Sequence, residues 1–374
     1  MSRAARSHVA AVAVLAMIAV LATACTSASR PRLGTPSTPT TSSRSTPSSA
    51  PSATRTTHPP AAPIGEFTFA FAGDVHFTER TAALLADPAT AFGPAAPALR
   101  RADLAMVNLE TAITTRGEPA PKDFHFRTPA TALTALRDAG IDLATMANNH
   151  AADYGPVGLS DTLAAIRRSH FPVVGIGADA DAAFAPWRTT VHGVKVAVIA
   201  ASQVRDETLA NYSAGASSPG IASADSERLV SAVRAAKAAG YVVVVYLHWG
   251  VEFQDCPNGD QRGLADTLAR AGATAIIGTH VHVLQGAGWR PDGAYVAYGL
   301  GNYLWWRSFG NTQDDNGLLT LTFRHDQVVA ARFAPARLDS RGIPVPATGT
   351  EATRINAQWA HVRTCAGLSA RPPG

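Results

Sequence analysis

The chain has 374 residues, of which 46% are hydrophobic and 16% are charged, and its formal net charge is +4 at pH 7. This composition is typical of a globular protein, and the length allows two average domains or one large domain with appendages. The small net charge, with no Lys/Arg stripe interleaved with aromatic residues, excludes a protein built to bind nucleic acid.

The first 25 residues have the pattern of a secretory signal. Two arginines precede an apolar stretch at residues 9–21, and small residues follow it. The stretch is short for a membrane span, although an uncleaved membrane anchor is an alternative. The residues LATAC, which end at Cys25, resemble a bacterial lipobox, in which the cysteine carries a lipid. We therefore expect an exported, extracytoplasmic protein, anchored to the membrane as a lipoprotein.

Residues 26–63 consist almost wholly of Ser, Thr, Pro, Ala and Arg. Such a segment cannot bury enough apolar surface to offset the entropy of ordering it. We interpret it as a solvated stalk that carries a folded domain at residues 64–345. After residue 345 the pattern of strands and helices ends, and residues 346–374 are expected to form a C-terminal tail of uncertain order.

The folded region alternates apolar strand-like runs with alanine-rich helical patterns, which is typical of an α/β fold. The predicted strands are residues 67–73, 104–109, 143–146, 173–175, 195–200, 242–247, 275–278 and 294–298, and the predicted helices are residues 81–86, 130–139, 157–169, 226–239 and 261–271. Residues 318–323 and 328–333 are expected to form a closing hairpin.

Two cysteines remain outside the lipobox, Cys256 and Cys365. In an exported chain an even pair favours a disulfide, and this one would tie the C-terminal tail to the loop that follows His248. Two unpaired thiols are the alternative.

Polar side chains of the kind that binds metals follow five of the predicted strands. They are Asp74 and His76; Asn108 and Glu110; Asn148, Asn149 and His150; His248 and Glu252; and His280 and His282. In open α/β sheets, ligands bind outside the carboxyl ends of the strands, so these side chains are expected to converge.

Each motif has a simpler explanation when it is taken alone. Asp74 and His76 fit a polar turn, His150 fits a loop before a helix, and residues 279–282 fit a strand whose histidines face solvent. Five such motifs at strand ends favour a single metal site instead.

The ligand types narrow the choice of metal. Carboxylate, imidazole and amide ligands suit Zn, Mn or Fe(II) rather than Ca, and the lack of cysteine argues against a structural zinc site. One ion cannot use the whole set, which is Asp74, His76, Glu110, Asn149, His248, His280 and His282. A pair of divalent metal ions with Glu110 as the bridge would accommodate it, and paired metals about 3.5–4 Å apart are typical of phosphate-ester hydrolysis.

Six motifs resemble, in this order, the signature series of the CapA family, which comprises capsule synthesis proteins associated with poly-γ-glutamate. They are FAGDVHF, VNLET, MANNHAADYG, LHWGVEF, IIGTHVHVLQ and YGLGNYLW, and the resemblance covers roughly residues 67–333. This family belongs to the calcineurin-like metallophosphatase superfamily. The resemblance therefore implies a calcineurin-like metallophosphoesterase fold, a four-layer α/β/β/α sandwich with a dimetal centre at the sheet edge.

The resemblance also implies a role for each site residue. Asp74, His76 and His282 would hold the first ion, Asn149, His248 and His280 the second, and Glu110 would bridge them. His150 would protonate the leaving group or stabilise the transition state. Glu110 stands where the superfamily has an aspartate, and His76 stands where many CapA relatives carry an apolar residue.

Several neighbouring residues allow two readings. Glu252 is either a partner of the metal ligands or a solvated carboxylate, and Asn302 either approaches the pocket or only closes a glycine-flanked turn. Arg127 could bind an anionic substrate. Trp305 and Trp306 could form a polymer platform or could serve packing alone.

The first functional hypothesis is a metal-dependent hydrolase in capsule, poly-γ-glutamate or envelope polymer synthesis. Its partners would be an anionic envelope polymer or a phosphorylated precursor, and a capsule synthesis complex. The second hypothesis is a non-catalytic component of assembly or export that binds the polymer. A γ-glutamyl hydrolase or transpeptidase is a third possibility, but no Ser or Cys nucleophile is evident, so it would depend on metal-activated water.

Overall fold

The computed structural model describes residues 65–374. The predicted signal, the predicted lipidation site at Cys25 and the predicted stalk lie outside the described residues. Within residues 65–374, none of the helices is both long enough and apolar enough to cross a membrane.

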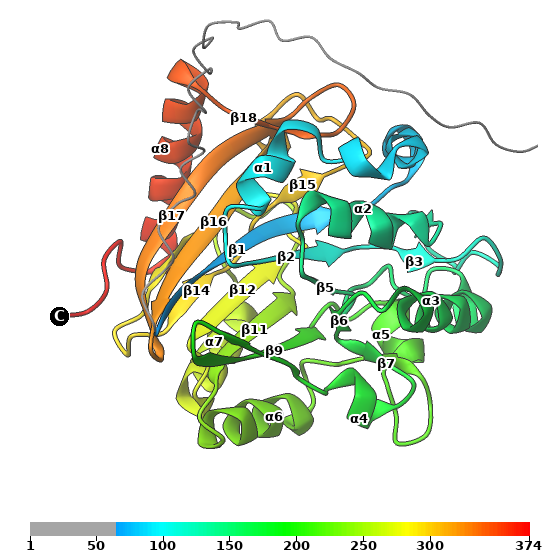
Figure 1. Cartoon of the computed structure of the whole chain (residues 1–374), viewed down its shortest axis with the longest axis horizontal. Coiled ribbons are helices and arrows are strands. Elements are labelled where there is room, and N and C mark those ends of the chain that lie inside the picture. Colours follow the sequence, from blue (N-terminus) through cyan, green and yellow to red (C-terminus); the bar gives the residue numbers. More distant parts are fainter. Residues whose placement is uncertain (1–64) are drawn as a thin grey trace, which may run out of the picture. The chain divides into compact units, whose positions relative to one another are not determined.

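The first of two large sheets has eight strands in the order β18–β17–β16–β1–β2–β5–β6, with β15 paired to the end of β1 (Figure 1). Strands β15, β1, β2, β5 and β6 run parallel, whereas β16, β17 and β18 are antiparallel to their neighbours. The bounds are β1 Glu66–Val75, β2 Leu104–Leu109, β5 Leu143–Thr145, β6 Val173–Val174, β15 Asn302–Leu304, β16 Asp315–Arg324, β17 Gln327–Leu338 and β18 Pro344–Pro346. The expected closing hairpin, β16–β17, is confirmed.

The second sheet has six strands in the order β13–β14–β12–β11–β9–β8. Its inner strands are parallel, and β8 and β13 close the two edges in antiparallel fashion. The bounds are β8 Trp187–Val191, β9 Val194–Ser202, β11 Val242–His248, β12 Ala275–Thr279, β13 Ala287–Trp289 and β14 Tyr295–Ala297. Two short ladders join β3 Ala112–Ile113 to β4 Arg127–Thr128 and β7 Ile176–Gly177 to β10 Gly220–Ile221.

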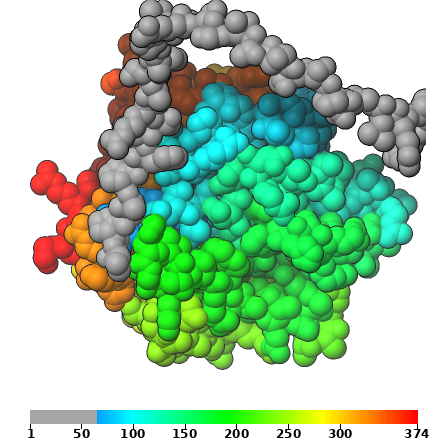
Figure 2. All heavy atoms as spheres, in the orientation of Figure 1, coloured from blue at the N-terminus to red at the C-terminus, as the bar shows by residue number. Residues whose placement is uncertain are grey.

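The helices are α1 Ala96–Leu99, α2 Thr131–Ala139, α3 Gly155–Ser169, α4 Ala180–Ala183, α5 Glu207–Tyr212, α6 Glu227–Ala238, α7 Gly259–Ala271 and α8 Gly349–Ala366. Four 3₁₀ segments are η1 Glu79–Ala86, η2 Pro88–Thr90, η3 Gly93–Ala95 and η4 Thr312–Asp314. The space-filling view shows the segments that hold α2, α3 and α4 over much of the face turned toward the reader (Figure 2).

Alternate residues of the central strands belong to different cores, as the side-chain period of a strand requires. On β9, Val196 and Val198 lie between the two sheets, whereas Ala197 and Ile199 lie in a core with α6 and α7. The first sheet divides in the same way, because β1 and β2 send alternate residues between the sheets and into a core with α1, α2 and α3. Three cores therefore separate four layers, and the expected α/β/β/α sandwich is confirmed.

The C-terminal segment differs from the tail of uncertain order that the sequence led us to expect. Helix α8 has 18 residues and packs along β17 (Figure 1). Its buried residues are Ile355, Trp359, Val362 and Ala366, and Trp359 stacks on Phe333 with ring centroids 4.1 Å apart. Their spacing of four, three and four is helical, but the apolar stripe is only one residue wide, so the pattern is weak in sequence.

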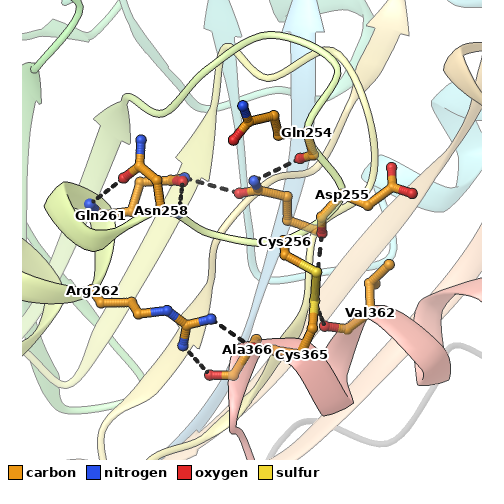
Figure 3. The surroundings of a disulfide bond; sticks show 10 residues. Gln254, Asp255, Cys256, Asn258, Gln261, Arg262, Val362, Cys365 and Ala366 are labelled. Carbon is orange, nitrogen blue, oxygen red and sulfur yellow. Dashed lines mark hydrogen bonds between the residues drawn. A yellow bond between two sulfur atoms is a disulfide. The ribbon is translucent and has the colours of Figure 1, made fainter.

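The expected disulfide is present between Cys256 and Cys365, whose Cα atoms are 5.8 Å apart (Figure 3). The bond joins the loop after β11 to the last turn of α8 across a sequence separation of 109 residues. Beside it, the Arg262 guanidinium donates hydrogen bonds to the carbonyl oxygens of Cys365 at 2.6 Å and Ala366 at 2.9 Å. Because the last carbonyls of a helix have no partner within it, Arg262 and the disulfide together fix the end of α8.

Candidate metal centre

The carboxyl ends of four parallel strands, two from each sheet, meet at one buried place. On β1 and β2, Asp74 pairs in register with Asn108, and on β11 and β12, His248 pairs with Thr279. The Asn108 amide links the two sheets, because its Nδ2 donates to Asp74 Oδ1 at 2.8 Å and lies 3.2 Å from His248 Nδ1. The motifs at the strand ends therefore converge as the sequence predicted.

Two groups of ligand atoms form within this space. One consists of Glu110, His280 and His282, and the other of Asp74, Glu110 and His248, and within each group the atoms lie within 4.8 Å of one another. Both groups are buried, and Glu110 belongs to both. This shared position suits the bridging role predicted for Glu110.

Asn149 completes the surroundings of the second group. Its Oδ1 lies 2.8 Å from His248 Nε2, which is also 3.5 Å from Glu110 Oε1. An amide oxygen, a carboxylate oxygen and an imidazole nitrogen thus face one another. The structure thus brings Asn149 together with His248 and Glu110, whereas His280, which was predicted to share an ion with Asn149, lies in the other group with His282.

The buried polar atoms show that the donor set fits a divalent cation. Glu110 Oε1 and His280 Nδ1 are both buried, and neither has a hydrogen-bond partner among residues 65–374. Burial and the neighbouring Asp74 carboxylate raise the pKa of Glu110 well above its ordinary value. Two dehydrated carboxylates at close range are costly unless a cation neutralises them. Carboxylate oxygens with imidazoles are ligands that Zn, Mn and Fe(II) accept.

His282 and Asp74 form a buried charge pair, with His282 Nδ1 3.4 Å from Asp74 Oδ2. Burial would lower the pKa of His282, but the Asp74 hydrogen bond and the Glu110 charge raise it to about 9. Burial would raise the pKa of Asp74, but His282 and His248 outweigh that effect and hold it below its usual range. Without an ion, His282 is the group that compensates the buried negative charge.

The backbone is strained where it presents two of the histidines. His280 has φ of 88° and His282 has φ of 56°, a region that residues other than glycine rarely adopt. The His280 N–H donates to Asp74 Oδ2 at 3.2 Å, and the His282 Nδ1 lies 2.9 Å from Asn302 Oδ1. Such strain persists only where the surroundings enforce it, and it is characteristic of functional sites.

His76 is buried but belongs to neither ligand group. Its ring centroid lies 4.3 Å from that of Phe126 and 4.2 Å from that of Trp305, and its Nε2 accepts a hydrogen bond from the Trp306 N–H at 3.3 Å. This bond places the proton of the neutral ring on Nδ1, which has no partner. Burial, with the charges of His150 and His282, lowers the pKa of His76 well below its ordinary value. The predicted role of His76 as a ligand stays a prediction.

His150 lies beside the ligand groups rather than among them. Its Nε2 is 3.8 Å from Glu110 Oε1, and its Nδ1 is 2.7 Å from Asp153 Oδ2. Asp153 also pairs with Lys122 at 2.5 Å and accepts a hydrogen bond from the Phe126 N–H at 2.7 Å. Burial and Lys122 lower the pKa of His150 well below its ordinary value, while burial raises the pKa of Asp153 to about 6. Asp153 thus orients the imidazole so that Nε2 faces the centre.

The sequence interpretation missed Asp153 and Lys122 and gave Asn108 no role. Asp153 stands three residues after His150, a spacing at which a carboxylate can reach back to the imidazole ring. The sequence could therefore have indicated this contact. Lys122 lies in a loop with no periodic pattern, and nothing in the sequence indicates its position. Asn302, which was left open, approaches the centre through His282.

Three other residues whose role was left open, Glu252, Arg127 and Trp305, lie outside the ligand groups. Glu252 Oε1 lies 4.0 Å from His282 Nε2, but its side chain is 47% exposed, so it is a solvated neighbour of the centre. Arg127 lies over the ring of Tyr154 at 4.6 Å and lines a separate pocket. Trp305 is buried and packs on His76 and His282.

Comparison with known proteins identifies the family. Residues 68–305 match the model of the bacterial capsule synthesis protein PGA_cap. The chain is 32% identical over 225 residues to the PGA biosynthesis protein CapA of Bacillus subtilis and 28% identical over 265 residues to the capsule biosynthesis protein CapA of Bacillus anthracis. These alignments cover 58% and 69% of this chain but only 57% and 63% of the two relatives. The chain therefore spans less than two thirds of their length.

A third relative, a probable polyglutamine synthesis accessory protein of Mycobacterium tuberculosis, is 32% identical over 192 residues, which are 48% of this chain and 50% of the relative. Among solved structures, a novel phosphatase from Mycoplasma pneumoniae aligns with a TM-score of 0.47 and 12% identity over 73% of this chain and 94% of its own. The assignment of the four layers rests on the sheets and cores of this chain alone. Because the family model spans well over half of the sequence, the chain belongs to the PGA_cap family of bacterial capsule synthesis proteins.

Proposed function

We propose that this protein is an exported, metal-dependent hydrolase that cleaves a phosphate ester of an envelope polymer or its precursor during capsule or poly-γ-glutamate synthesis. The observation that carries the proposal is Glu110, a buried carboxylate shared by two ligand groups with one oxygen that has no partner. A cation bound beside a carboxylate in this state stabilises its charged form.

Asp74, Glu110 and His248, with Asn149, would hold one ion, and Glu110, His280 and His282 the other. Divalent ions bound there supply Lewis-acid polarisation of water and of the phosphoryl group. Asn108 holds the side chains of Asp74 and His248 in place, because its amide contacts both of them. The buried setting strengthens every charge interaction at the reacting group.

His150 is the residue that would exchange a proton with the substrate. In the hydrolysis, a water oxygen forms a bond to phosphorus and gives up a proton to solvent, the bond from phosphorus to the ester oxygen breaks, and that oxygen takes a proton from His150 and leaves as an alcohol. Because Asp153 engages Nδ1, the Nε2 atom of His150 is free to deliver the proton that the alcohol needs. A negatively charged substrate beside His150 favours the protonated ring.

Metal analysis with an activity assay tests the proposal. Purified wild-type protein should bind about two equivalents of Mn or Zn and hydrolyse simple phosphate esters. Asp74→Ala and His280→Ala should lose the metal and the activity, whereas His361→Ala, which changes an exposed histidine on α8, should retain both. Normal metal content in the first two variants would refute the proposed centre.

A second candidate function is a non-catalytic component that binds an anionic polymer. It is favoured by one observation, the name of the Mycobacterium tuberculosis relative, which is an accessory protein of synthesis. His150→Ala separates the two functions, because the variant should lose turnover if the protein is an enzyme. Binding of a γ-glutamyl polymer without any turnover in the wild type would support the second function instead.

The proposed site of action is outside the cytoplasm, at the membrane. The support for this comes from the signal-like segment and from Cys25 in LATAC. Cys25→Ala should move the protein from the membrane fraction to the soluble exported fraction of expressing cells. A wild-type protein that is already soluble would contradict the lipid anchor.

A further inference from the structure

The mouth of the metal centre is lined by aromatic rings. We call the set of Phe124, Phe126, Phe253, Trp305, Trp306 and Phe309 the aromatic collar. These six residues enclose a cavity of about 70 Å³ together with His150 and His282, so the collar is continuous with the proposed catalytic residue and a proposed metal ligand. The cavity wall runs from buried Trp305 and Phe126 to Phe124 and Phe253, which are 52% and 49% exposed.

The charges at the collar are few and balanced. The other residues that line the cavity are one cation, Arg307, and one anion, Glu252. Arg307 lies over the collar itself, 5.0 Å from the Phe309 ring and 5.9 Å from the Trp306 ring. Apart from the proposed metal ligands, a chain with a carboxylate on every residue would meet Glu252 and find Arg307 as the one cation that lines the cavity, so charge complementarity at the collar is poor for such a polymer.

The backbone that carries the exposed ring of Phe253 is strained. Its backbone has φ of 64°, which is unfavourable for a bulky residue, and the Phe253 N–H donates to the Val281 carbonyl at 2.8 Å. Three residues further on, Cys256 is bonded to Cys365 (Figure 3). A strained backbone that presents an exposed aromatic ring beside a reactive centre is not explained by packing.

The segment that carries Phe309, next to Phe253 in the collar, is held by hydrogen bonds to a carboxylate. Buried Asp314 accepts hydrogen bonds from Ser308 Oγ and from the N–H groups of Phe309 and Gly310, all at 2.8 Å. The rings of Phe253 and Phe309 meet with centroids 6.2 Å apart. The collar is therefore formed before any substrate arrives, which lowers the entropic cost of binding.

We propose that the collar binds an uncharged ring next to the scissile phosphate, so that the substrate is a phosphate ester of a ring-bearing alcohol rather than a γ-glutamyl chain. The ring could be a sugar or a heterocycle, because both present an apolar face that stacks on aromatic side chains. The part of this inference that concerns hydrolysis of the ester rests on the proposed function. The part that concerns binding of the ring to the collar does not.

Two matched pairs of phosphate esters test the inference, and in each pair both members leave as a primary alcohol. Glucose 6-phosphate is compared with glycerol 3-phosphate for a sugar ring, and adenosine 5′-phosphate with ribose 5-phosphate for a heterocycle. Hydrolysis by the metal-loaded protein gives kcat/KM, and calorimetric titration gives the binding of each ester. We expect glucose 6-phosphate to be preferred over glycerol 3-phosphate, or adenosine 5′-phosphate over ribose 5-phosphate, by about 10-fold. The pair that shows the preference identifies the ring.

Phe253→Gly is the informative variant, because glycine accepts the positive φ. It should keep or raise the midpoint of thermal unfolding, while the ring preference, taken as the ratio of kcat/KM or of affinity within a pair, falls about 10-fold. Trp306→Phe should retain most of the preference. Val345→Ala, which changes an exposed apolar residue outside the collar, should leave it intact.

The outcomes separate the two proposals. Hydrolysis of all four esters with no ring preference in rate or binding, or a preference that Phe253→Gly leaves unchanged, overturns the inference and leaves the hydrolase standing. A ring preference in titration without hydrolysis overturns the hydrolase and supports the collar as a ring-binding site.

Discussion

Gly73 packs directly against Gly301, so that a Cβ atom added to Gly73 would lie 1.9 Å from the carbonyl oxygen of Gly301. The same oxygen accepts a hydrogen bond from the Asp74 N–H at 3.0 Å, and the next residues, Asp74 and Asn302, pair in register between β1 and β15. Asn302 in turn contacts His282. Because Gly73 has no side chain, β1 and β15 can approach closely. This places Asp74, a proposed metal ligand, beside Asn302, which contacts the proposed ligand His282.

Gly73→Ala should therefore weaken both the fold and the metal centre. The clash is with backbone, which cannot rotate away, so we expect the free energy of unfolding to fall by about 1–3 kcal/mol and metal affinity to fall with it. Urea unfolding and metal analysis measure the two effects. Gly263→Ala is the matched control, because a Cβ there meets nothing within 4 Å and alanine favours the helix. Equal stability of Gly73→Ala and wild type would contradict the close packing.

Glu110→Gln should have opposite effects in the presence and absence of metal. Without metal it removes one of two neighbouring buried carboxylates, so the melting temperature should stay the same or rise. With metal the wild type should gain stability by mass action, about 2.7 kcal/mol at a hundredfold excess over Kd, and the variant should gain little. Thermal melts with and without Mn or Zn measure this difference. An equal gain in both proteins would show that Glu110 holds no ion.

The sequence predicted most of the fold because each central strand is a buried apolar run of the right length. It missed β8, whose residues Trp187–Val191 alternate between half-buried and exposed at a sheet edge. It also missed α8, whose single apolar stripe does not stand out against polar neighbours. In both cases the tertiary contact, rather than the local pattern, determines the element.

The part of the site that could be predicted consists of metal-binding residue types that stand directly after predicted strands. Glu110, His248 and His280 could be placed together in advance because parallel strands bring their carboxyl ends to one edge. The surroundings of His76 could not, because they depend on Phe126 and Trp305, which come from distant loops. The packing of these rings on His76 depends on the conformation of the loops, which the pattern of apolar and polar residues does not predict.

The Cys256–Cys365 disulfide should contribute strongly to stability. It closes a loop of 109 residues, for which chain entropy gives roughly 4–5 kcal/mol as an upper value. The double variant Cys256→Ser/Cys365→Ser should lose about 2–5 kcal/mol in the free energy of unfolding. Urea titrations with and without a reducing agent measure this loss. The reducing agent should destabilise the wild type and leave the double variant unchanged, and a wild type indifferent to reduction would refute the prediction.

Asp153→Asn should reduce turnover more than substrate binding. The carboxylate orients His150 through a 2.7 Å contact with Nδ1, and an amide can present its NH₂ group to that nitrogen and so favour the wrong tautomer. We expect kcat to fall by about 10²-fold on a simple phosphate ester, with KM and metal content little changed. Asp161→Asn is the control, because Asp161 pairs with Arg116 outside the centre. A loss of metal in Asp153→Asn would instead indicate that Asp153 supports the ligands.

The stability of the domain should depend on pH through Asp103, which lies outside the centre. This carboxylate accepts hydrogen bonds from the Thr68 N–H and hydroxyl, both at 2.7 Å, and lies 2.8 Å from His192 Nε2. Burial would raise its pKa, but these partners outweigh burial and lower the pKa below the ordinary value of 3.8. Because the folded state binds this proton more weakly than the unfolded state, the carboxylate stabilises the fold above pH 3.8, and the contribution is lost as the pH falls through the folded pKa. Asp103→Asn should thus be less stable than wild type at pH 7. The difference in the free energy of unfolding between the two proteins, measured by urea titration, should shrink as the pH falls below about 4. A gap of equal size at pH 7 and at about pH 3 would show that the loss in the variant comes from packing rather than from the charge of Asp103.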